Sequence, residues 1–123
     1  MTFIPLQNYL RTHRRRSQLS QDEVAFLLGV RTGTRVTRHE GANRVPTLAT
    51  ALGYELLFDV PLRELFTEEV GKVESIIRER LPELIRKVEE EGGEEQKLAF
   101  LRDVAKRLEN YEEKHSRSAD ARG

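Results

Sequence analysis

Two threonines and two arginines occupy positions 34 to 38, and their side chains are of the kinds that bind the edges of nucleic-acid bases: Thr34, Arg35, Thr37 and Arg38. Arginine bonds bidentately to guanine or to phosphate, and the threonine methyl group can contact thymine. Because the segment has no continuous apolar stripe, a short helix formed by it would present these side chains to solvent. The composition is therefore that of a surface that contacts nucleic acid.

A helix and a glycine turn must position that surface, and the segment 20–29, SQDEVAFLLG, has the pattern of both. Ser20 and Glu23 have the spacing of a capping box, in which each side chain bonds the backbone N–H of the other residue at the start of a helix. Gly29 can end the helix in the left-handed conformation. The expected apolar stripe of this helix is Val24, Leu27 and Leu28. A helix, a tight turn and a second short helix in this order are the sequence pattern of a helix-turn-helix motif.

Charge divides the chain although its net charge is zero. Residues 1–50 carry eight arginines against three acidic residues, whereas from residue 67 onward 12 Lys or Arg residues oppose 15 Asp or Glu residues. The basic half contains the helix-turn-helix pattern and fits a polyanionic partner, with a merely solvated basic face as the alternative. With no cysteine and no run resembling a signal peptide or membrane span, the chain is expected in the cytoplasm, associated with the nucleoid and without a membrane partner.

Three more helices are predicted in the first half, and no segment has the alternation of a β-strand. A first helix is expected from Pro5 to Arg16. Thr47 is expected to cap a fourth helix. The predicted apolar face of that fourth helix is Leu48, Ala51, Leu52 and Leu56. A short fifth helix carries Leu62, Leu65 and Phe66.

The remainder has the pattern of two amphipathic helices. The first is interrupted at Pro82, which is expected to kink or restart it, and Gly92-Gly93 ends it. The last helix is expected to start near Glu94 or Glu95. These features predict a domain over 1–68, an antiparallel hairpin over 69–115 and a disordered tail over 116–123. Whether the hairpin packs on the first domain, forms a dimer or binds another protein stays open at this stage.

The first half resembles the Xre-like family of DNA-binding domains, of the Cro and lambda-repressor type. The likeness covers LRTHRRRSQLSQDEVAFLLGV, VTRHE and the segment from Pro46 to Phe66, about half of the chain. Matching family features are Ser20, Gln21, Ala25 and Gly29. The resemblance implies an all-α fold, with a five-helix repressor-like domain followed here by the two-helix C-terminal hairpin.

The family also implies how the site works, with helix three in the major groove. Thr32 is expected to cap that helix. Arg35 and Thr34 rank first as base contacts, and Gln21 is expected to bond a base or an adjacent phosphate. Phosphate contacts are expected from Ser20, Arg31, Asn43 and Arg44. Arg14 and Glu40 occupy the positions of a structural ion pair beneath the DNA-facing surface.

The chain departs from the family pattern at three points. The interval from Gly29 to Glu40 is one residue longer than usual, which shifts the start of helix three or extends the loop before it. His39 replaces an aliphatic residue, and we expect a half-buried packing residue rather than a metal ligand. Ala42 stands where the family usually has glycine.

The sequence thus predicts a sequence-specific double-stranded DNA-binding transcriptional regulator, a repressor that acts as a homodimer on a two-fold operator. The alternative is an antitoxin-like or adaptor protein whose C-terminal hairpin binds a protein partner. An enzyme is not expected, and neither is a cofactor or a metal, because no nucleophile constellation, phosphate loop or ligand cluster is recognisable. The operator sequence, activation against repression and any inducer are not encoded in a recognisable way.

Overall fold

A computed structural model describes residues 8–122 of the chain, with side chains through residue 110. All regular elements in this range are helices, and no strand occurs in it. The chain divides between Gly71 and Lys72 into two compact units. Within the described range, no helix has the length and apolar character needed to cross a membrane.

Five helices build the first unit around one core. They are α1 (Leu10–Ser17), α2 (Gln21–Leu28), α3 (Gly33–Glu40), α4 (Leu48–Phe58) and α5 (Leu62–Leu65). The buried core comprises Leu10, Val24, Ala25, Val36, Tyr54, Leu65 and Phe66. Burying one large apolar side chain contributes roughly 1.5–3 kcal/mol, so these contacts hold the short helices, which would not be stable alone.

Helix α1 begins later than the predicted Pro5, at Leu10. The Asn8 side chain accepts the backbone N–H of Leu10 and donates to the carbonyl of His39, at 3.2 and 2.8 Å. Tyr9 donates its backbone N–H to the carbonyl of Leu65, 2.9 Å away. Long-range hydrogen bonds therefore set the start of α1 where local periodicity predicts more helix, and residues 5–7 lie outside the described range.

The predicted signals around α2 are confirmed, apart from one position of its stripe. Ser20 and Glu23 form both bonds of the capping box, and Gly29 ends the helix at φ 69°. Leu27 is 56 % exposed, so it does not belong to the buried stripe; Val24 and Ala25 supply the buried positions. Thr32 occupies the cap position of α3 but makes no side-chain cap bond.

Helix α4 turns a different face to the core from the predicted one. Thr47 caps it as expected, accepting the N–H of Thr50. Tyr54 is buried, and Ala51, one of the four predicted residues, packs against the core, whereas Leu48, Leu52 and Leu56 are exposed. The sequence LATALGYELLF is apolar nearly all round the helix, so its periodicity cannot select the buried arc.

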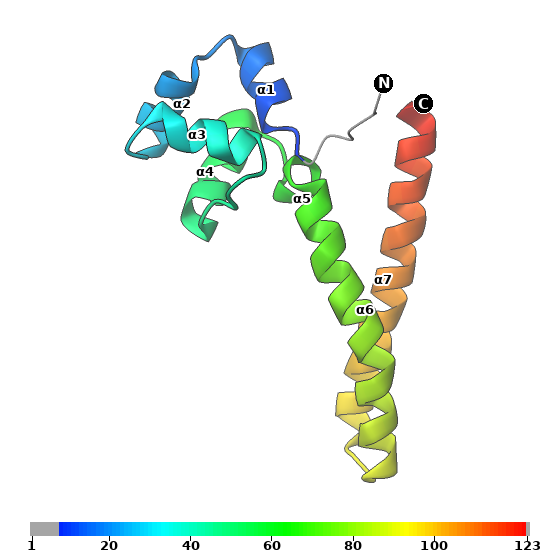
Figure 1. Cartoon of the computed structure of the whole chain (residues 1–123). Helices are drawn as coiled ribbons and strands as arrows, with labels where there is room; N and C mark the ends of the chain where they lie inside the picture. The colour runs from blue at the N-terminus through cyan, green and yellow to red at the C-terminus, as the bar shows by residue number, and fades with distance from the viewer. Residues whose placement is uncertain (1–7, 123) are drawn as a thin grey trace. The chain divides into compact units, whose positions relative to one another are not determined.

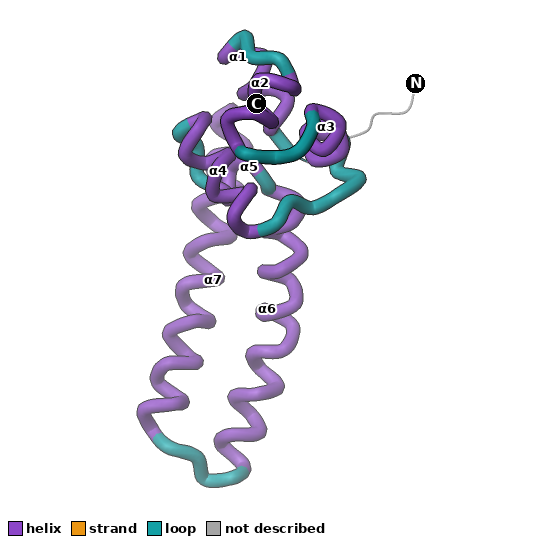
Figure 2. Tube along the Cα trace, turned by 90° about the vertical axis from the view of Figure 1, so that its left-hand side faces the viewer, coloured by secondary structure: helices purple, strands orange, loops and turns teal. Residues whose placement is uncertain are grey.

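The second unit is formed by residues 72–90 of α6 (Thr67–Glu90) and by α7 (Glu95–Arg122), which run antiparallel and side by side (Figures 1 and 2). Arg102 bonds Glu89 at 2.7 Å, and Arg78 donates to the carbonyl of Leu108 at 3.3 Å. Gly92 adopts φ 67° in the turn between the helices.

Two expectations for this part of the chain differ from the structure. Helix α6 continues through Pro82 without a restart, with Leu81 and Val88 buried on either side of the proline. Helix α7 continues past Ser116 to Arg122, where the sequence indicated a disordered tail, because no glycine or proline interrupts residues 95–122.

Candidate nucleic-acid interface

Helix α3 has one buried and one exposed face. Gly33, Val36 and His39 are buried at a spacing of three residues. The exposed positions between them are Thr34, Arg35, Thr37 and Arg38. The four side chains predicted to point outward therefore do so, on a helix held from behind.

The first turn of α3 lies against the first turn of α2. A Cβ atom at Gly33 would collide with the Asp22 carboxylate and lie 3.1 Å from the Asp22 backbone nitrogen. A side chain at position 33 would require the Asp22 carboxylate to move and its backbone to shift slightly, whereas glycine fits this approach as it is. Helix α3 starts at Gly33, so residues 30–32 form the connection between Gly29 and the helix.

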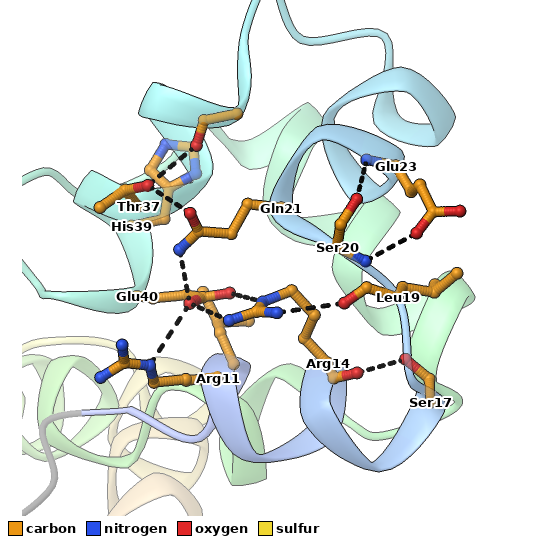
Figure 3. A network of polar contacts seen from close by, with 12 residues as sticks. Arg11, Arg14, Ser17, Leu19, Ser20, Gln21, Glu23, Thr37, His39 and Glu40 are labelled. Carbon is orange, nitrogen blue, oxygen red and sulfur yellow. Dashed lines mark hydrogen bonds and ion pairs between the residues drawn. The ribbon is translucent and has the colours of Figure 1, made fainter.

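An ion pair between Arg14 and Glu40 fixes the other end of α3 to α1 (Figure 3). Arg14 donates from Nε to Oε2 at 2.5 Å and from Nη2 to Oε1 at 3.1 Å, a bidentate arrangement. A third donor, Nη1, bonds the Leu19 carbonyl at 3.1 Å. The side chains are only 12 % and 4 % exposed, and the carboxylate raises the pKa of Arg14. Arg14 therefore serves the fold and is not free for a ligand.

Gln21 extends this ion pair to the exposed face of α3. Its Nε2 donates to Glu40 Oε1 at 3.1 Å, and its Oε1 accepts the Thr37 hydroxyl at 2.8 Å (Figure 3). Gln21 and Thr37 are both expected to contact DNA, and in the structure they are hydrogen-bonded to each other. The guanidinium groups of Arg35 and Arg38 make no ion pair or hydrogen bond with any residue whose side chain the structure describes.

His39 is a core residue, more deeply buried than expected. Only 3 % of it is exposed, and its Nδ1 lies 2.9 Å from the Tyr54 hydroxyl. Burial lowers the pKa of His39, and the charges of Arg44 and Arg35 lower it further. Burial likewise raises the pKa of Tyr54 above its ordinary value. The neutral pair joins α3 to α4 through the core.

The loop after α3 holds two of the predicted phosphate contacts at the surface. Asn43 and Arg44 are exposed, as is Arg31 in the turn before α3. Asn43 donates its backbone N–H to the Arg38 carbonyl at 3.0 Å, which closes the loop onto the helix. Ala42 adopts φ 58°, the left-handed conformation that glycine prefers. Ser20 is exposed too, with its hydroxyl oxygen accepting in the capping box.

Sequence reasoning missed two residues that support the site. Asn8 bonds the His39 carbonyl, and Tyr54 bonds the His39 ring. The partner of Asn8, His39, lies 31 positions later in the chain, so no local signal predicts this bond. No local signal marks Tyr54, because its partner lies 15 positions earlier in the chain.

Comparison of the chain with protein-family models, curated proteins and solved structures finds no match. Among the described residues, no group of three His, Cys, Asp or Glu side chains could hold a metal ion.

Proposed function

We propose that this protein is a sequence-specific, double-stranded DNA-binding transcriptional regulator, with α3 in the major groove. The observation that carries the proposal is the exposed face of α3 described above, with its two unpaired arginines, on a helix anchored from behind. Base edges are distinguished only by donors and acceptors held in fixed positions, and an anchored helix supplies them.

The electrostatics of the first 50 residues support the same partner. Eight arginines oppose three acidic residues there, and Glu40 among the three is occupied by Arg14. The guanidinium groups of Arg31 and Arg44 flank α3 in sequence and are exposed, as phosphate contacts must be. In this proposal Arg35 reads a base, whereas Arg44 binds phosphate.

A dimer on a two-fold operator forms part of the proposal, because one small domain reads too few base pairs for high specificity. The second unit offers apolar surface for it: Val73, Ile76, Ile77, Leu84 and Phe100 are 43–62 % exposed. Two such hairpins can bury these side chains in a four-helix arrangement.

Selection of bound sequences from a random DNA pool tests the proposal. Arg35→Ala should relax base preference at one position of each half-site, at a cost of about 1–3 kcal/mol there. Arg44→Ala should weaken binding to all sequences alike and reduce the salt dependence by about one counterion. Arg86→Ala, at an exposed arginine of the second unit, is the matched control. Failure of the intact protein to select any sequence contradicts the proposal.

The same apolar hairpin surface supports a second candidate, an adaptor or antitoxin-like protein that holds a protein partner. Ile76→Glu combined with Phe100→Glu distinguishes the two by analytical ultracentrifugation and copurification. Loss of the dimer favours the regulator, and loss of a copurifying protein from an unaltered monomer favours the adaptor.

A further inference from the structure

The exposed residues of α4 are all apolar: Leu48, Ala49, Leu52 and Leu56. The three leucines, spaced four apart, form one straight row along the helix, here called the α4 row. They are 72 %, 42 % and 84 % exposed, and Val45, just before the helix, is 63 % exposed.

The leucines of the α4 row are not part of the hydrophobic core. The buried arc of α4 is filled by Tyr54, with Ala51, Leu57 and Phe58 packed around the same core. Each large apolar side chain left in water forgoes roughly 1.5–3 kcal/mol of burial energy. Contiguous exposed apolar residues of this kind are typical of an interaction surface.

The size of the row limits what can occupy it. A stable interface between free proteins uses about 20–30 residues on each side, far more than this row offers. A partner already tethered to the chain needs much less, because its effective concentration is on the order of millimolar. In the dimer proposed above, the second copy is such a tethered partner.

Charge favours a second copy as well. Two DNA-binding units repel each other through the arginine excess of residues 1–50, unless they meet at a neutral face. The only ionisable side chain of α4 apart from Tyr54 is Glu55, which is turned to the Leu62 N–H at 2.9 Å. The α4 row is therefore an uncharged face in a basic unit.

We propose that the α4 row packs against the α4 row of a second copy and so sets the spacing between the two α3 helices. A two-fold axis between the rows makes the contact self-complementary, with leucine ridges interdigitating. The segment that links α3 to α4 is residues 41–47, so the contact would fix the distance between the half-sites that the dimer accepts. The inference rests on the proposed function for its DNA-bound form.

The first experiment measures DNA affinity of the full chain with Leu48→Gln and Leu56→Gln combined. Glutamine is used because a new carboxylate would weaken DNA binding by itself. Affinity for one half-site should stay unchanged, and affinity for the two-fold operator should fall about tenfold or more. The preference for one half-site spacing should also disappear. Leu27→Gln, at an exposed leucine of α2, is the matched control. Unchanged affinity and spacing preference in the double variant overturn the proposal.

A second experiment needs no DNA. The chain has no cysteine, so Leu52→Cys introduces a single thiol at the centre of the row. Under copper-phenanthroline oxidation, L52C should form a disulfide-linked dimer at least tenfold faster than L27C. Selective cross-linking by a protein that binds no DNA would refute the proposed function and leave the contact standing. Equal cross-linking by the two variants, with normal operator binding, would refute the contact alone.

Discussion

The two units of the chain use opposite charges in different ways. In the first unit, Arg14 pairs with Glu40, whose carboxylate is 4 % exposed. That carboxylate accepts hydrogen bonds from Arg14 and Gln21, and Arg11 forms a longer ion pair with it at 4.0 Å. In the second unit, Arg102 and Glu89 pair at 58 % and 47 % exposure. Both are short contacts, but only the first excludes water, so only there does losing one partner strand a buried charge. The Arg14–Glu40 pair therefore stabilises the fold, whereas the exposed Arg102–Glu89 pair contributes little to stability.

The largest effect should come from breaking the buried pair. Glu40→Ala leaves the Arg14 guanidinium with only the Leu19 carbonyl, and should lower the free energy of unfolding by about 3–5 kcal/mol. Glu89→Ala, the matched change at the surface pair, should cost at most about 1 kcal/mol. Urea titrations of both variants measure the difference. Equal midpoints would remove the distinction between the units.

A smaller effect should follow from acidification. The pKa of His39 lies below its ordinary value of 6.5 in the folded protein, so the unfolded chain takes up the proton first. The contribution of neutral His39 is therefore complete above about pH 6.5 and is lost as the pH falls toward the folded-state pKa. Urea unfolding at pH 7.5 and 5.5 should show reduced stability at the lower pH. His39→Gln should remove most of that decrease; an undiminished decrease would assign it to another group.

The smallest effects concern two residues in the same left-handed conformation, Ala42 at φ 58° and Gly92 at φ 67°. Ala42→Gly relieves backbone strain in the first unit and should stabilise it by about 0.5–1 kcal/mol. Gly92→Ala introduces that strain in the second unit, where a Cβ meets no other atom, and should destabilise it by about 1 kcal/mol. Thermal melts of the two variants should shift in opposite directions. Shifts of the same sign would show that backbone conformation is not the cause.

Local signals predicted the parts of the fold that local hydrogen bonds determine. The Ser20 capping box, the Gly29 turn and the Thr47 cap each need only neighbours a few residues away, and all are present. The start of α1 could not be predicted in this way, because it depends on the bond between Asn8 and His39 across 31 positions.

Within the site, the sequence pattern predicted which side chains of α3 are exposed, but it did not predict the hydrogen bonds and the ion pair between site residues. The outward face of α3 follows from its own periodicity. The Arg14–Glu40 pair came from family resemblance rather than from a local pattern, and the Gln21 link between Glu40 and Thr37 was missed. The buried arc of α4 was mispredicted because an apolar helix offers several arcs of similar character, and Tyr54 is drawn inward by a partner on α3.

The link from Gln21 to Thr37 also determines the direction of one hydrogen bond at the surface. Gln21 donates its amide group to Glu40, so its carbonyl oxygen must face Thr37 and accept the hydroxyl proton. The Thr37 hydroxyl has a single proton. It donates that proton within the protein, to the side-chain carbonyl of Gln21 and the backbone carbonyl of Gly33. Toward a ligand, Thr37 can therefore only accept. Phosphate oxygens have no proton to donate to the Thr37 hydroxyl oxygen, so they are unsuitable partners. The exocyclic amino group of adenine or cytosine can donate a hydrogen bond to that oxygen.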